Sequence, residues 1–172
     1  HNRRITAAER NALSSFDVPI LGGPDSLIDA TRYLNTKLGG DALPRLSEAI
    51  TRSLLRLDDS SLSIHHIERL PALLRLLSEA HAQNPIPKGL RTSLASKKIW
   101  QVESGALLAI SNPDAYMPTD FKPPPLGEGV KLFKKPSAPG YSKLLRDLGA
   151  RTFNQAEFVQ RVFIENFGDR SV

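Results

Sequence analysis

Histidine and glutamate stand close together in the run His65-His66-Ile67-Glu68, the one cluster of metal-ligand residue types in the chain. Neighbouring residues of a helix point about 100° apart, so His65 and His66 cannot both face one ion. His65 and Glu68 share a helix face, but a third ligand would have to come from elsewhere, and His81 lies far along the chain. We therefore expect polar histidines at a solvated helix start and no metal site.

Three other short motifs have residue types used in catalysis or phosphate binding, and none has the required pattern. General acid–base catalysis needs two carboxyl groups that face one substrate, which the adjacent Asp58 and Asp59 do not provide. Ser104 lacks the preceding glycine of a nucleophile elbow. Gly127 and Gly129 fit neither glycine-rich phosphate motif. Since the chain also has no cysteine, we expect no catalytic residue, no cofactor and no enzyme activity.

Basic residues gather in the run Lys131-Leu132-Phe133-Lys134-Lys135. In one interpretation Lys131, Lys134 and Lys135 contact the phosphates of a polyanion while Phe133 stacks on a base. In the other, Leu132 and Phe133 pack on the core and the lysines face water. The sequence favours the second interpretation and leaves the first open.

The net charge of +5 comes entirely from the second half of the chain. Residues 1–86 hold ten Lys/Arg and ten Asp/Glu, whereas residues 87–172 hold thirteen and eight. Such asymmetry is one indication of a polyanionic partner. A nucleic-acid-binding module that uses the lysines from Lys88 to Lys143 is therefore the alternative function. The other explanation of this charge is that these lysines keep proline-rich loops soluble.

The length of 172 residues suits one ordinary domain, and 40% apolar and 24% charged residues are typical of globular proteins. No apolar run approaches the ~20 residues that cross a bilayer, so we expect no membrane partner. Without cysteines or a signal peptide, the expected location is intracellular, in the cytoplasm or nucleus. Because the chain starts at His1 instead of methionine, we expect a piece of a longer protein.

Capping residues and apolar periodicity predict helices on both sides of a central non-helical region. Thr6 and Glu9 have the spacing of a capping box. Pro71 either divides the fourth helix or starts a new one. Gly149 suits the end of one late helix, and Asn154 suits the cap of the next. The expected helices cover residues 6–16, 24–38, 41–57, 63–83, 88–96, 141–148 and 154–167.

The stretch Lys97–Phe121 holds the only tryptophan and the only methionine. Apolar residues from Ile99 to Val102 precede Glu103-Ser104-Gly105, and Ala106–Ile110 follow it. Two short apolar runs around a glycine-containing turn predict a β-hairpin. Because an isolated hairpin is marginally stable in water, it must pack on the helices or join other strands.

Residues 111–140 contain seven of the thirteen prolines, and we expect little regular structure there. Apolar side chains within this segment indicate a long Pro-rich loop that is pinned to the domain. Large apolar side chains dominate the binding energy of protein interfaces when they are exposed. We therefore expect a partner-binding surface that consists of Trp100, Tyr116, Met117 and Phe121.

Together these elements predict a mainly α fold, a helical bundle-like domain with one small β-hairpin and a long Pro-rich loop. We expect a single domain over residues 1–172. Its front helices cover 6–96, the hairpin and Pro-rich loop cover 97–140, and a C-terminal helix pair covers 141–168.

Several short phrases follow one another between residues 94 and 167. They are Leu94-Ala95-Ser96-Lys97-Lys98-Ile99-Trp100, Glu103-Ser104-Gly105-Ala106-Leu107-Leu108-Ala109-Ile110, Tyr116-Met117-Pro118, Val130-Lys131-Leu132-Phe133, Leu144-Leu145-Arg146-Asp147-Leu148-Gly149-Ala150 and Glu157-Phe158. In this order they resemble the repeat regions of sacsin-like giant Hsp90-type-ATPase chaperones, although Lys98 stands where the family repeats usually have a proline. The resemblance implies a scaffold or chaperone-like segment without an active site of its own.

The expected function is a non-enzymatic protein–protein interaction or scaffold module of a larger intracellular protein, and the resemblance implies a relation to chaperones. A protein is the expected partner. The alternative is the nucleic-acid-binding module described above.

Overall fold

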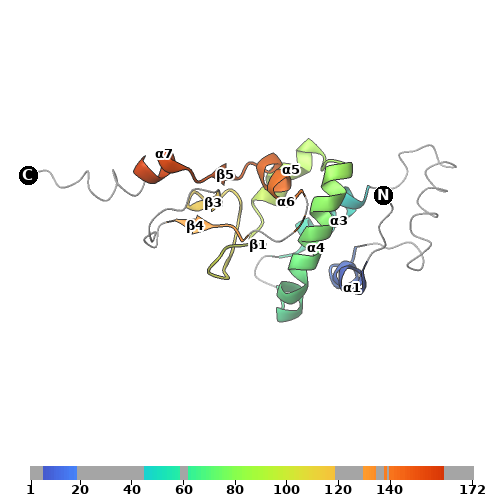
Figure 1. Cartoon of the computed structure of the whole chain (residues 1–172). Helices are drawn as coiled ribbons and strands as arrows, with labels where there is room; N and C mark the ends of the chain where they lie inside the picture. The colour runs from blue at the N-terminus through green and yellow to red at the C-terminus, as the bar shows by residue number, and fades with distance from the viewer. Residues whose placement is uncertain are drawn as a thin grey trace, which may run out of the picture.

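The computed structural model describes residues 6–18, 45–58, 62–118, 130–134, 138 and 140–160. The helix expected over 24–38, the end of the last helix, Phe121 and Lys135 lie outside the described residues. Within the described part the chain forms six helices and five short strands (Figure 1). The mainly α fold with a small hairpin is thereby confirmed.

Helix α4, Ile64–Gln83, is the longest element of the described chain. Ser63 caps it, because the Ser63 hydroxyl accepts the backbone N–H of His66. Pro71 lies inside the helix, so the prediction that it divides the helix or starts a new one is wrong. A proline in a helix interior removes one backbone hydrogen bond. Here the helix continues because its apolar side chains, including Leu70, Leu73 and Leu77, are buried against the rest of the fold.

Three other helices pack directly on α4 (Figure 1). They are α1, Ala7–Ser15, α3, Leu46–Arg56, and α6, Tyr141–Asp147. The capping box predicted for Thr6 and Glu9 is present at the start of α1. Helix α3 starts at Leu46, later than the predicted Asp41, because the backbone of the preceding Arg45 is extended and not helical.

Helix α5, Lys88–Ala95, packs on α3 and leads into the hairpin. Strand β1, Trp100–Gln101, pairs antiparallel with β2, Leu107–Leu108. Gly105 lies in the turn with a φ of 90°, a left-handed conformation that glycine adopts without strain. The predicted hairpin is confirmed.

A second, three-stranded sheet lies beside the hairpin, and all its strands are parallel. Strand β3, Ala115–Met117, is central, between β4, Lys131–Leu132, and β5, Arg151–Thr152. A bridge between Val102 and Phe133 connects it to the hairpin. The expectation of little regular structure over 111–140 is therefore wrong for β3 and β4. Each strand has only two or three residues, too few for an alternating pattern.

Helix α6 starts after Gly140, whose φ is 84°, and Gly149 follows its end as predicted. Asn154 caps the short helix α7, Gln155–Phe158, because its side chain accepts the backbone N–H of Glu157 at 3.0 Å. A single cluster of buried apolar side chains extends from α1 to the residue before β5. The elements thus share one core, against which the hairpin and the parallel sheet are fixed.

Candidate functional site

The large apolar residues expected to bind a partner are in the core. Trp100 and Tyr116 have no exposed surface, and Met117 is also buried. The Trp100 indole N–H donates to the Leu94 carbonyl at 3.4 Å. Trp100 and Met117 belong to the same cluster of buried side chains as the helices, and the ring of Tyr116 packs edge-on against Phe153 with centroids 5.2 Å apart. A binding surface of Trp100, Tyr116 and Met117 is therefore wrong, and the fourth residue, Phe121, lies outside the described residues.

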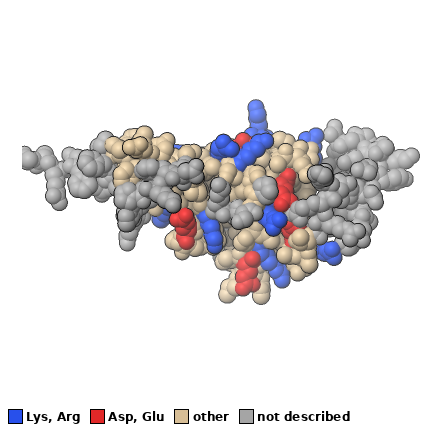
Figure 2. Space-filling model, viewed as in Figure 1, with Lys and Arg blue, Asp and Glu red and all other residues tan. Residues whose placement is uncertain are grey.

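The basic run has its aromatic side chain inside and its described lysines outside. Phe133 is fully buried, whereas Lys131 and Lys134 are exposed. The prediction that Phe133 packs on the core is confirmed, and Phe133 cannot stack on a base. Figure 2 shows a small group of basic side chains at the upper edge, and elsewhere on this face single basic residues near acidic ones. The face shown in Figure 2 has no continuous basic surface that would support nucleic-acid binding. Nucleic-acid binding therefore stays a prediction.

The histidine–glutamate run lies open to solvent at the start of α4. His65 and Glu68 form an ion pair at 3.8 Å, and both side chains are mostly exposed. Among the residues that the structure describes, no group of three potential ligands could hold a metal ion.

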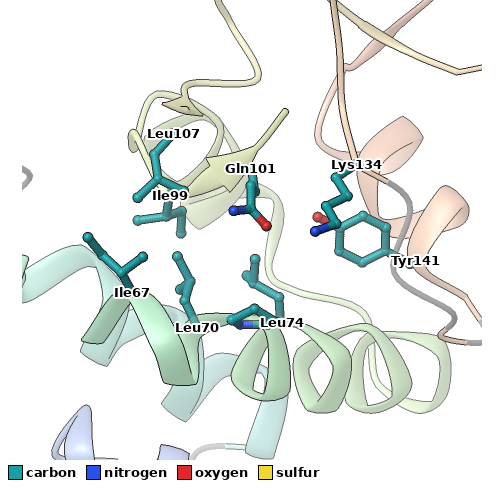
Figure 3. A pocket seen from close by; sticks show the side chains of 9 residues that line it. Ile67, Leu70, Leu74, Ile99, Gln101, Leu107, Lys134 and Tyr141 are labelled. Carbon is teal, nitrogen blue, oxygen red and sulfur yellow. The ribbon is translucent and has the colours of Figure 1, made fainter. Parts of the chain in front are cut away.

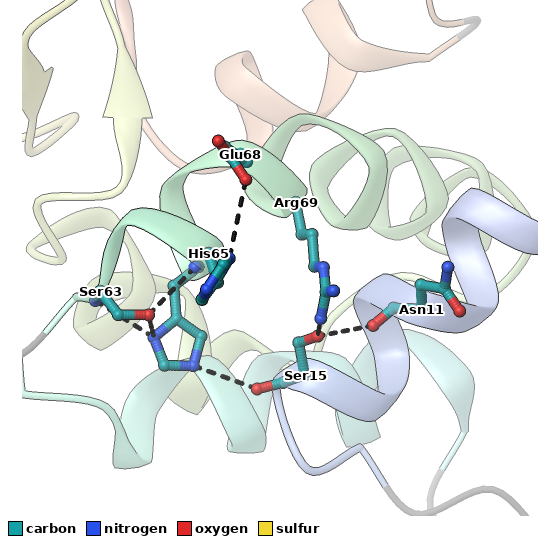
Figure 4. A network of polar contacts seen from close by, with 7 residues as sticks. Asn11, Ser15, Ser63, His65, Glu68 and Arg69 are labelled. Carbon is teal, nitrogen blue, oxygen red and sulfur yellow. Dashed lines mark hydrogen bonds and ion pairs between the residues drawn. The ribbon is translucent and has the colours of Figure 1, made fainter.

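His66 and Arg69 instead connect α4 to the end of α1 (Figure 4). His66 Nε2 donates to the Ser15 carbonyl at 3.1 Å, and Nδ1 accepts the Ser63 backbone N–H at 3.3 Å. Arg69 donates to the Ser15 hydroxyl, which in turn donates to the Asn11 carbonyl at 2.7 Å. This network holds two helices together and leaves neither ring nitrogen of His66 available as a base.

A second histidine, His81, is fully buried and pairs with Asp147 across 66 residues of sequence. The Ile86 backbone N–H donates to His81 Nδ1 at 3.1 Å, and His81 Nε2 lies 2.8 Å from Asp147 Oδ2. The hydrogen bond from His81 lowers the pKa of Asp147, burial opposes this shift, and the charges of Lys143 and Arg91 lower the pKa further. Nothing in the sequence pointed to this pair, because its members come from distant helices.

A pocket of about 100 Å³ opens between α4, the hairpin and α6 (Figure 3). Figure 3 shows Ile67, Leu70 and Leu74 on α4 facing Ile99, Gln101 and Leu107 across this space. Most of its lining is apolar. The apolar residues are Ile67, Leu70, Pro71, Leu74, Ile99 and Leu107, and the polar atoms come from Gln101, Lys134 and Tyr141. The sequence singled out Lys134 only as part of a polyanion site.

Exposed aliphatic side chains continue from this pocket along α4. Three large apolar side chains of the described residues are exposed, and two of them are Ile64 at 73% and Ile67 at 41%. Residues 64, 67 and 71 share one helix face, because they are spaced by three and four. We call Ile64, Ile67 and Pro71 the α4 stripe. The α4 stripe shares Ile67 and Pro71 with the pocket lining and extends this apolar surface to Ile64.

No family model matches this chain, and no curated protein and no solved structure matches it. In the part of the chain that the structure describes, no helix is long and apolar enough to cross a membrane.

Proposed function

We propose that the chain is a non-enzymatic protein–protein interaction or scaffold module of a larger intracellular protein, with the α4 stripe and the pocket as its docking surface. The observation that carries this proposal is the exposure of Ile64 and Ile67 next to a mainly apolar pocket. Exposed aliphatic side chains that adjoin a concave apolar site are typical of surfaces that bind proteins.

The polar side chains support a binding role over a catalytic one. General base catalysis needs a ring nitrogen or carboxylate within reach of a substrate. His66 and His81 each use both ring nitrogens in hydrogen bonds that hold helices together. The resemblance of residues 94–167 to sacsin-like chaperone repeats adds support for a scaffold, and relates the module to chaperones.

A selection from displayed peptides tests the proposal. The complete 172-residue chain is immobilised, and random peptides displayed inside a carrier loop are selected against it. We expect enriched peptides with aliphatic residues. Replacing Ile67 with Asp should weaken their binding by roughly thirtyfold or more, because loss of an apolar anchor costs about 2 kcal/mol or more.

Two further variants make the result specific. Ile64→Asp puts the same charge in the first turn of α4, where a carboxylate favours the helix, so loss of binding there is not a folding defect. Val159→Asp is the matched control, because Val159 is similarly exposed at 45% but lies beyond α7, away from the pocket. Equal binding by wild type and both stripe variants, or no enriched peptide, contradicts the proposal.

A further inference from the structure

One end of the pocket holds the hydroxyl of a buried tyrosine. Tyr141 is 2% exposed, and among the residues that the structure describes none donates to or accepts from its hydroxyl. Buried polar groups in native proteins nearly always have a partner. In Figure 3 the ring of Tyr141 points from α6 toward the end of the Lys134 side chain. The hydroxyl is therefore placed to contact a group that enters this pocket.

Lys134 and Tyr141 place hydrogen-bond donors at this end of the pocket, and the side-chain amide of Gln101 adds an oxygen that accepts. Burial raises the pKa of Tyr141, so its hydroxyl keeps the proton and can donate it. The ammonium of Lys134 carries three donors, and no salt bridge within the described chain engages it. Gln101 uses its amide nitrogen in a long hydrogen bond of 3.5 Å to the Gly105 carbonyl. A carboxylate, which only accepts and carries a negative charge, complements the donors of Lys134 and Tyr141.

The rest of the pocket selects the group attached to that carboxylate. Its lining is mostly apolar, and its volume is about 100 Å³. This space is large enough for one aliphatic side chain. Ile67 is exposed where it lines the pocket, and the exposed Ile64 lies one helical turn further along α4, so both offer apolar contacts to further residues of a longer ligand. A peptide uses this continuation, and a free short-chain acid does not.

We propose that the pocket binds the last residue of a partner protein, with its aliphatic side chain between α4 and the hairpin and its α-carboxylate on Lys134 and Tyr141. This inference rests on the proposed function and specifies the partner as a C-terminus that ends in an aliphatic residue. The residues before this C-terminus lie along the α4 stripe.

Fluorescence anisotropy with the complete chain tests this assignment. The probe is a labelled hexapeptide with apolar residues and a C-terminal leucine, made once as the free acid and once as the amide. We expect the free acid to bind about tenfold or more tightly than the amide, since hydrogen bonds to a charged group are strong. Tyr141→Phe removes one oxygen, and Lys134→Met removes the charge but keeps an apolar stem. Each should bring acid and amide within about threefold.

Lys131→Met is the matched control, because Lys131 is an exposed lysine on β4 that does not line the pocket. It should leave the preference for the free acid unchanged. If acid and amide bind wild type equally, the C-terminal assignment fails while a protein-binding function stands. Failure of both peptides to bind also overturns the assignment, and the displayed loop peptides, which have no free C-terminus, decide the proposed function separately. If 4-methylpentanoate alone binds as tightly as the peptide, the occupant is a small acid and the peptide assignment is wrong.

Discussion

At the scale of single residues, the imidazole of His81 shows how a buried ionisable group is used for structure. Its Nδ1 accepts the Ile86 N–H, so the ring proton is on Nε2 and is donated to Asp147. This arrangement joins α4, the turn after it and α6. Histidine and aspartate often act together in catalytic sites. Here both ring nitrogens of His81 are engaged in hydrogen bonds, so the His81–Asp147 pair holds the helices together.

The lowered pKa of Asp147 predicts a dependence of stability on pH. The folded state favours the carboxylate, so this contribution is complete above the ordinary pKa of about 4 and is lost as pH falls through the lower folded value. Urea denaturation, followed by fluorescence of the buried Trp100, measures the free energy of unfolding. We expect wild type to be more stable than Asp147→Asn above about pH 5, and the difference to shrink below about pH 4.

Glu103→Gln, which removes an exposed carboxylate, is the control for the loss of one negative charge. A difference between wild type and Asp147→Asn that stays constant from neutral to acidic pH would show that the hydrogen bond from His81 does not set the titration of Asp147.

Residue roles that depend on neighbours in sequence were predictable, and those that depend on distant neighbours were not. The Thr6 and Asn154 caps follow from side chains that reach backbone groups within one turn. The burial of Trp100 depends on helices that come before and after it, including the ring of Tyr141 at 6.4 Å. Tyr141 was recognised as a helix start, and nothing local indicated that its hydroxyl lines a pocket.

At the scale of elements, α4 positions the proposed site. Its buried face packs on α1, α3 and α6, and its stripe of Ile64, Ile67 and Pro71 remains beside the hairpin. The apolar period of the sequence predicted a helix over residues 63–83, which α4 confirms. Periodicity gives the apolar face of a helix but not how far a neighbouring element covers that face.

Replacement by alanine should have opposite effects on stability at two glycines, Gly140, where α6 comes close to α4, and Gly89, where α5 has open space. Gly140→Ala should destabilise the fold by about 1–2 kcal/mol, because its φ is 84° and the new Cβ would lie 3.3 Å from the Ser78 carbonyl oxygen. Gly89→Ala in α5 meets nothing within 4 Å and should stabilise the fold by roughly 0.5–1 kcal/mol. Urea denaturation of both variants measures these changes, and a shift of the same sign in both would refute this account of the α4–α6 contact.

Strands β3, β4 and β5 could not be predicted from short stretches of sequence, because their pairing partners are distant along the chain. Tyr116 pairs with Leu132 on one side and with Arg151 on the other. Parallel strands are joined by long connections, so no tight turn between them indicates the pairing in the sequence. The hairpin was predictable because its two strands are joined by a tight turn at Gly105.

At the scale of the whole molecule, one core fixes the hairpin, the parallel sheet and α6 around the pocket. Lys134 comes from the chain just after β4, Tyr141 from α6 and Ile67 from α4, so the pocket exists only in the assembled fold (Figure 3). Trp100 of the hairpin supports this surface from inside, because its ring lies 6.4 Å from the ring of Tyr141, which lines the pocket. The central claim is that the pocket and the α4 stripe form the surface that contacts a partner.

Methyl NMR of the complete chain, labelled at isoleucine, tests that claim most directly. On addition of an enriched displayed peptide, we expect the resonances of Ile64, Ile67 and Ile99 to shift in proportion to binding. Ile50 is the internal control, because it is fully buried on α3 and does not line the pocket. Saturable binding that leaves all three pocket and stripe resonances in place, or that moves Ile50 as much as Ile67, would contradict the account.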